Sequence, residues 1–224
     1  MRPDDHLWDA AGVDDATAAA RNNARWCDAV CRSHGVVTEF SDDIWCSTSR
    51  SPVLYPDAVT LSPRLTEREV LARIDAGAGA SVKDSFATLD LTTAGFELLF
   101  DATWIRLDST DLVTDRWSEV RDVQALRAFA ADHGGGEVFR PSLLDDQDVA
   151  VLSDGRGSGA IANVSDQVVG MSNTFGPDLA GAVAAIAAAF PARPLVGYDR
   201  GEKLDVLLGI GFRAVGPLRV WLKP

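Results

Sequence analysis

The sequence predicts an α/β fold, in the broad sense that includes α+β folds: a mixed sheet flanked by helices, built as two tandem half-sized copies. Segments with helical spacing of apolar residues alternate with short apolar runs along the whole chain. The order of these segments occurs twice. Each half also closes with a short helical approach, a Gly-Phe pair and an apolar run holding one tryptophan, at Gly95-Phe96 and Gly211-Phe212. The matched endings favour an internal duplication.

The first half reads as helix, strands, helix, strand, helix, strand. A helix over 16–32 ends at Ser33-His34-Gly35, where the glycine suits the left-handed cap position. Thr66 caps a later helix, with Glu69 three residues on as its capping-box partner. The remaining predicted elements are a hairpin over 36–49, a strand over 57–62, a helix over 66–75, a short strand over 80–86, a short helix over 87–95 and a long strand over 96–107.

The second half repeats this order. It contains a helix over 119–136, three antiparallel strands over 148–154, 159–166 and 167–173, a helix from Phe175 to Phe190, a strand over 193–199, a helix over 202–211 and a final strand over 212–223. We therefore predict an N-terminal arm at 1–22, an N-terminal unit at 23–108, a linker at 109–118 and a C-terminal domain at 119–224.

Composition limits the classes of function. The chain has 224 residues, 46% of them hydrophobic, and a mean hydropathy near zero, so it is long enough to bury a substantial core. The net charge of -12 opposes binding to phosphate backbones. We expect no nucleic-acid partner. An aminoacyl-transfer enzyme of the kind built on such tandem units would need tRNA, so the charge counts against it.

The termini and the cysteines indicate a cytoplasmic chain. The first residues lack a basic segment followed by an apolar one, and the most apolar stretch, Leu179 to Phe190, is too short to span a bilayer. We expect no membrane partner. Three cysteines do not make a disulfide framework. We interpret them as small buried residues, with a nucleophilic Cys27 or a half metal site at Cys27 and Cys31 as the alternatives. The histidines are scattered, so we expect no metal.

The second half resembles the GNAT family, the Gcn5-related N-acetyltransferases. The residues that carry the resemblance are the strands "VAVLSDGRGSGAIANVSDQVVGMSN", the helix Leu179 to Phe190, and "PLVGYDRGEKLDVLLGIGFRAVGPLRVWLK". The late strand, short helix, Gly-Phe pair and last strand form the most specific part. The resemblance covers 117–224 well and 23–108 more weakly, and it implies a GNAT-like fold in tandem.

The resemblance implies that acetyl-CoA, or another acyl-CoA, lies in a V between the fourth and fifth strands of the second half. The residues it assigns to this ligand are Val169, Gly170, Met171, Ser172, Asn173, Thr174, Phe175 and Gly176. In the family, a loop rich in glycine then wraps the pyrophosphate at a helix N-terminus. The loop here, "NTFGPDLAG", has no glutamine or basic lead residue and no G-x-G, and Asp178 stands at the helix start.

Two clusters occupy the same place in the two halves, at the end of the fifth strand. Lys83, Asp84 and Ser85 form the first, and Tyr198, Asp199, Arg200 and Glu202 the second. We predict catalytic roles for Asp199, Tyr198 and Asp84, because carboxylates and phenols exchange protons. The predicted substrate-binding residues are Lys83, Arg200, Asn163 and Tyr55. The family's usual tyrosine, four residues before the glycine of the Gly-Phe pair, is replaced by Leu207 and by Leu91.

These features support two functions. The first is an N-acyltransferase that moves an acetyl group from acyl-CoA to a small amine. The alternative is a repurposed or catalytically inactive GNAT fold that binds a small metabolite or a protein partner, which the altered loop favours. Whether the chain is an enzyme stays open on the sequence alone, and so does its oligomeric state, a homodimer included.

Overall fold

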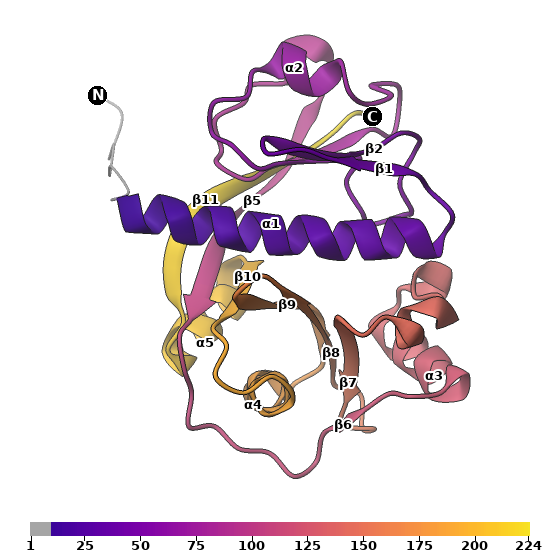
Figure 1. Ribbon diagram of the computed structural model, residues 1–224, viewed down its shortest axis with the longest axis vertical. Coiled ribbons are helices and arrows are strands. Elements are labelled where there is room, and N and C mark those ends of the chain that lie inside the picture. The colour runs from indigo at the N-terminus through magenta and orange to yellow at the C-terminus, as the bar shows by residue number, and fades with distance from the viewer. Residues whose placement is uncertain (1–9) are drawn as a thin grey trace.

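The computed structural model describes residues 10–224, and these form one mixed sheet of 11 strands flanked by helices (Figure 1). The strand order is β1-β2-β3-β4-β11-β5-β10-β9-β8-β7-β6. The predicted mixed sheet flanked by helices is confirmed. The sheet is continuous through both halves of the chain, so the proposed unit boundaries do not divide it.

In the first half the elements are α1 (Ala10–Ser33), β1 (Thr38–Phe40), β2 (Ile44–Ser47), β3 (Ala58–Thr60), α2 (Glu67–Leu71), β4 (Ser81–Asp84), the 3-10 turn η1 (Thr92–Ala94) and β5 (Glu97–Leu107). In the second half they are β6 (Ser118–Glu119), α3 (Val123–His133), the 3-10 turns η2 (Gly136–Val138) and η3 (Pro141–Asp145), β7 (Val149–Ser153), β8 (Gly159–Ser165), β9 (Val168–Phe175), α4 (Leu179–Ala189), β10 (Leu195–Asp199), α5 (Gly201–Ile210) and β11 (Arg213–Leu222).

The last strands of the two halves are exchanged within the sheet. The final strand, β11, lies between β4 and β5 and pairs antiparallel with both. In turn, β5 pairs with β10 of the second half, with Tyr198 opposite Trp104. The two long strands therefore join the halves through backbone hydrogen bonds, and Figure 1 shows them running side by side through the molecule.

Within the described residues, the sheet has two parallel strand pairs, and both are short. The strands β3 and β4 pair as far as Val59 and Lys83, and β9 and β10 pair as far as Gly170 and Val196. Beyond this point β9 and β10 no longer pair. We call the segments 171–175 and 197–199, which no longer pair with each other, the fork. Asn173 has a positive φ of 50°, and the pairing of β9 with β8 shifts register here, so β9 carries a bulge at the fork.

Helix α1 packs against strands of both halves. Its buried face, which includes Ala24 and Cys27, shares one core with Val59 of the first half and Val196 of the second. The buried side chain of Asn22 donates hydrogen bonds to Asn163 O, at 3.0 Å, and to Ser165 Oγ, at 2.9 Å. No helix within residues 10–224 has the length and the apolar character needed to cross a membrane.

Some local elements differ from the sequence predictions. The predicted arm at 1–22 is only partly described, and Ala10 onward belongs to α1, with Ala16 to Asn22 packed in or near the core. The helix at 66–75 is short, although its Thr66–Glu69 capping box is present. The segment 87–95 contains only η1, because the carboxylates of Asp84 and Asp90 bind backbone N–H groups of the segment and favour turns.

The two Gly-Phe pairs have the same geometry. Gly95 and Gly211 are the left-handed caps of η1 and α5, with φ of 82° and 118°. The next N–H bonds back to a buried leucine carbonyl in both cases, from Phe96 to Leu91 at 3.2 Å and from Phe212 to Leu207 at 3.1 Å. A side chain at either glycine would strain the backbone, which explains why glycine stands at both positions.

Gly170 is expected to tolerate no side chain. A Cβ at this position would overlap Oδ1 of Asn22 and Oδ1 of Asn163, the two residues that fix α1 to the sheet. Gly170→Ala should lower the free energy of unfolding by about 2 kcal/mol, as overpacking does. The measurement is urea unfolding. Gly209→Ala is the control, because nothing lies near its Cβ and helical alanine is favoured. Equal stability of Gly170→Ala and the wild type would contradict this account.

Candidate functional site

A cavity of about 250 Å³ lies at the fork and is lined by α1, β9, β10, Lys83 of β4 and the loop before β3. We call it the central cavity. Eight sequence-predicted residues line it, namely Tyr55, Lys83, Met171, Ser172, Asn173, Thr174, Tyr198 and Asp199. The structure therefore brings together residues predicted separately as catalytic, substrate-binding and CoA-binding.

Lys83 is the most unusual residue of the central cavity. It is only 4% exposed, yet within residues 10–224 no carboxylate lies at ion-pair distance from its ammonium. Its Nζ donates to Asn23 Oδ1 at 2.7 Å and to Tyr198 Oη at 3.2 Å, and it lies 4.3 Å from the centre of the Tyr198 ring. A buried cation held by neutral groups favours an anion beside it.

Trp104 supports the ring of Tyr198. Its ring meets the buried Trp104 edge-on, with ring centres 5.3 Å apart, and Trp104 Nε1 donates to the carbonyl of Ser85 at 2.8 Å. The phenol oxygen therefore stays beside Lys83. A hydroxyl that receives a hydrogen bond from an ammonium is a good donor to a ligand anion.

A second polar pair lies on the opposite wall. The Asn173 amide and the Tyr55 hydroxyl are 3.3 to 3.5 Å apart, and Trp26 of α1 contacts Tyr55 edge-on. Burial is the main cause that raises the pKa of Tyr55 above its usual range, so its phenol stays neutral. The positive φ at Asn173 turns this side chain toward Tyr55 and the cavity. The wall can thus donate and accept hydrogen bonds without carrying charge.

Lys203 of α5 crosses the fork. Its Nζ donates to the carbonyl of Thr174 in β9 at 2.9 Å and pairs with Asp199 in β10 at 3.3 Å. The predicted catalytic carboxylate, Asp199, is therefore engaged by a cation. The lysine also ties the two diverging strands together at the place where the arm of a CoA molecule would run.

The N-terminus of α4 does not fit a pyrophosphate. Asp178 caps the helix, with Oδ1 accepting from the Gly181 N–H at 3.0 Å and Oδ2 accepting from Trp117 Nε1 at 3.0 Å. Gly176 packs against Gly157 and Ser158, where a Cβ would overlap the backbone. A carboxylate already occupies the position where a helix start binds phosphate, and it would repel one. The residues present therefore do not fit the pyrophosphate of acyl-CoA.

Several predicted residues lie outside the central cavity. Asp84 is fully buried, burial being the main cause that raises its pKa, and it accepts from Leu89 N at 2.8 Å. Asn163 donates to the backbone of Asn22 on α1. Arg200 is exposed, its guanidinium lying 4.5 Å from the centre of the Phe100 ring. These residues do not face the cavity. Neither do Val169, Gly170, Phe175 and Gly176, although the rest of the predicted CoA strand does.

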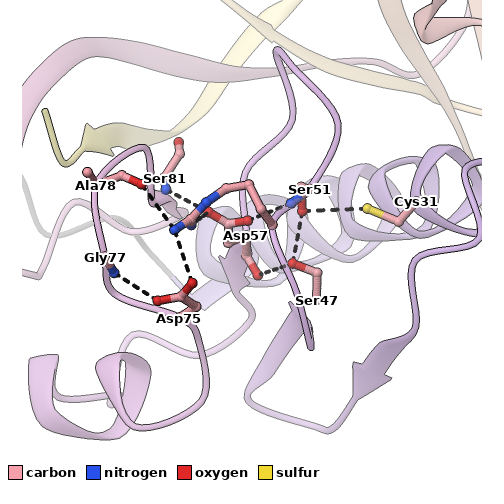
Figure 2. A network of polar contacts seen from close by, with 9 residues as sticks. Cys31, Ser47, Ser51, Asp57, Asp75, Gly77, Ala78 and Ser81 are labelled. Atoms are coloured by element: carbon pink, nitrogen blue, oxygen red, sulfur yellow. Dashed lines mark hydrogen bonds and ion pairs between the residues drawn. The ribbon is translucent and has the colours of Figure 1, made fainter.

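The loop at 50–56 forms one wall of the cavity, and Asp57 anchors it (Figure 2). This buried carboxylate accepts from Arg50 Nη1 at 2.5 Å and from the Ser51 N–H at 2.8 Å. It also accepts from the Ser81 N–H at 2.9 Å, so the loop is joined to the start of β4. Figure 2 shows Asp57 at the centre of this network, in which Ser51 contacts both Ser47 and Cys31 of α1.

Sequence reasoning missed five cavity residues, namely Asn23, Trp26, Leu54, Pro56 and Lys203. The signal for the first was present, because Asn22-Asn23 places two poor helix formers within an alanine-rich helix. Cys27 also lines the cavity, and burial raises its pKa to about 12, which does not suit a nucleophile. Within residues 10–224, no group of three or more His, Cys, Asp and Glu side chains is placed to hold a metal ion.

No protein-family model matches the sequence, and no curated protein matches it either. Among solved structures, a protein from Novosphingobium aromaticivorans assigned to the GNAT family of acetyltransferases superposes with a TM-score of 0.55 at 11% identity, over 95% of this chain and 97% of that one. The chain has a GNAT-like fold. A conserved protein of unknown function from Staphylococcus epidermidis superposes with this GNAT-like fold at a TM-score of 0.52 and 12% identity, over 80% of this chain and 83% of that one.

A GCN5-related N-acetyltransferase from Kribbella flavida gives a TM-score of 0.45 at 15% identity, over 63% of this chain, and the chain spans 42% of its length. All these identities are low. The comparisons therefore support the GNAT-like fold alone, and an activity has to be argued from the geometry of the site.

Removing the Asp57 charge is expected to loosen the cavity wall. Asp57→Asn replaces one acceptor oxygen by a donor, which then faces Arg50, Ser51 or Ser81, all of them donors. The free energy of unfolding should fall by about 2 kcal/mol, the cost of an unsatisfied buried group. Urea unfolding measures this. Asp75→Asn is the matched control, because Asp75 also pairs with Arg50 but is exposed, and its effect should stay below about 0.5 kcal/mol. Equal effects of the two substitutions would contradict the anchoring role.

The buried thiol of Cys27 is expected to make stability depend on pH in the alkaline range. In the unfolded chain the thiol ionises near its ordinary pKa of 9.0, but in the folded chain burial raises this pKa to about 12. Its contribution to stability is therefore complete below pH 9.0 and is lost as the pH rises toward about 12. The thermal midpoint should fall over this range more steeply in the wild type than in Cys27→Ala. Parallel curves for the two proteins would rule out this role of Cys27.

Proposed function

We propose that this chain binds a small carboxylate-bearing molecule in the central cavity of its GNAT-like fold. The observation that carries the proposal is Lys83, a buried ammonium that faces the cavity with only neutral hydrogen-bond partners. A ligand carboxylate beside it would supply the missing negative charge. It would also accept from Tyr198, whose hydroxyl lies next to the ammonium.

The charges of the cavity favour a single carboxylate over a phosphate. Lys203, the other cation of the cavity wall, already pairs with Asp199. This leaves one uncompensated positive charge, which matches one negative charge. A phosphate dianion would bring a second charge with no cation to meet it, and burying an unpaired charge costs several kcal/mol. Neutral donors on the other wall, Tyr55 and Asn173, suit the remaining polar atoms of a small metabolite.

We further propose that the fold arose by duplication of a half-sized unit. The matching hydrogen bonds at the two Gly-Phe pairs and the two short parallel strand pairs support it. In this interpretation the first unit contributes Lys83 and Tyr55 to a site at the fork of the second, and 109–118 links the units. The acidic net charge supports a small-molecule ligand and opposes nucleic-acid and anionic membrane partners. We also propose that the protein is cytoplasmic.

Acyl transfer from acyl-CoA to a small amine is the second candidate. The bulge of β9 at Asn173 favours it, because the family offers backbone groups of this strand to the arm of CoA. The capped N-terminus of α4 and the lysine across the fork count against it. The two candidates differ in a direct way, since only the second needs CoA.

The proposal is tested by measuring thermal stabilisation with small carboxylates. Acetate and benzoate are each added at millimolar concentration beside the corresponding neutral amide. Carboxylates should stabilise the full chain and the amides should not. Lys83→Met keeps the length of the side chain and removes its charge, so it should weaken carboxylate binding at least about tenfold. Lys223→Met is the matched control, since Lys223 lies near Phe96, away from the cavity.

Four results would overturn the proposal. The first is stabilisation by the amides equal to that by the carboxylates, and the second is carboxylate binding that Lys83→Met leaves unchanged. The third is micromolar calorimetric binding of acetyl-CoA and of desulfo-CoA to the wild type, which would establish the acyl-CoA site in its place. The fourth is the absence of stabilisation by any carboxylate.

A further inference from the structure

We infer that the ligand is a linear apolar carboxylic acid of medium chain length, whose carboxylate lies at Lys83 and whose chain lies in a second cavity. This inference rests on the proposed function, since it takes the carboxylate position from it. It adds the chemical class of the rest of the ligand. None of the residues that the GNAT resemblance assigns to CoA lines the second cavity.

The second cavity has a volume of about 530 Å³, twice that of the central cavity. It lies between the loop at 50–56 and the strands β4, β5 and β11. Aliphatic and aromatic side chains form most of its wall, namely Val53, Leu99, Phe100, Val220 and Leu222. We call it the apolar cavity. Binding of an apolar chain in such a cavity is favourable, because it removes the apolar surface of the chain and that of the cavity wall from water.

The two cavities meet at Lys83. Five residues line both of them: Leu54, Tyr55, Pro56, Lys83 and Tyr198. The ammonium therefore stands at the junction, with the polar groups Asn23 and Asn173 on one side and the apolar cavity on the other. A molecule whose carboxylate binds at Lys83 has direct access to the apolar cavity for its chain.

The charged residues that line the apolar cavity leave a binding position for only one charged group of a ligand. Arg50 also lines it, but its guanidinium is taken up by Asp57 and by the exposed Asp75. Lys83 is left as the cation without a carboxylate partner among the described residues of this wall. The arrangement matches a molecule with one anionic end and an uncharged remainder. A dicarboxylate would place its second charge against apolar side chains, at a cost.

Leu54, at the rim of the apolar cavity, combines an exposed apolar side chain with an unfavourable backbone conformation. Leu54 is 72% exposed and has a positive φ of 75°, a conformation that a leucine rarely adopts. The Asp57 network holds the loop in this shape. Strain of this kind is retained where the surrounding structure fixes it, and it clusters at ligand sites. Here it points an apolar side chain at the junction of the two cavities, where a ligand chain would cover it.

The test is calorimetric titration of the full chain with linear monocarboxylates of increasing length, namely acetate, butanoate, hexanoate and octanoate. Affinity should rise about fourfold for each methylene that enters the apolar cavity. Octylamine has the same chain with a cationic end, and octanol has it with a neutral end. Both should bind at least about tenfold more weakly than octanoate, because they cannot pair with Lys83.

Two neighbouring leucines of β5 provide a matched pair of variants. Leu98 and Leu99 are 45% and 52% exposed, and Leu99 alone of the two lines the apolar cavity. Leu99→Asp should lower octanoate affinity at least about tenfold by placing a charge beside the chain, whereas Leu98→Asp should leave it within about twofold of the wild type. Both substitutions are at exposed positions, so the fold is expected to persist, and thermal unfolding checks it.

The outcomes separate this inference from the proposed function. Rising affinity with chain length, lost in Leu99→Asp and in Lys83→Met, supports both. Acetate and octanoate binding equally well would refute the medium-chain acid and leave the carboxylate site standing. Octylamine or octanol binding as tightly as octanoate would refute the inference, because the chain alone would then account for binding. No binding of any carboxylate would refute both.

Discussion

The antiparallel pairing of β5 with β11 is the constraint on which the rest of the structure depends. It joins Arg106 to Arg213 and Glu97 to Leu222, so each of these contacts spans roughly half of the chain. Because β11 also pairs with β4, and β5 with β10, neither half has a complete sheet without the other. Pairing across such a sequence separation costs loop-closure entropy and slows folding, and here it completes the central part of the sheet.

The same exchange creates the candidate site. Lys83 on β4 and Tyr198 on β10 are separated in the sheet by β11 and β5, yet their long side chains meet above these strands. Trp104 of β5 supports the Tyr198 ring, and α1 adds Asn23 from the same face. One cation and its neutral partners thus come from four elements of both halves. The site forms only when both halves are folded together, so its geometry depends on the stability of the whole chain.

Local sequence patterns predicted the elements well where a local interaction decides them. The Thr66–Glu69 capping box and the two left-handed glycines before Phe96 and Phe212 are such cases. They could not predict the strand exchange, because β5 and β11 have the same alternation whichever strand they pair with. The prediction of the site was also incomplete, because sequence patterns do not reveal which surface a helix packs against. Asn23 and Lys203 lie on helices, where a polar residue looks solvated until the partner surface is known.

The interactions that hold the fork in shape also change which ligand it can bind. In the GNAT resemblance a helix start holds a phosphate and two diverging strands admit the arm of CoA. Here Asp178 satisfies the N-terminus of α4 from within the chain, and Lys203 satisfies the carbonyl of Thr174 and the carboxylate of Asp199. Each interaction stabilises the chain without a ligand and opposes CoA. Lys83 is the opposite case, because its charge is left for a ligand to meet. In the proposed function, the contrast among Asp178, Lys203 and Lys83 would place the ligand at the junction of the two cavities and not at the outer end of the fork.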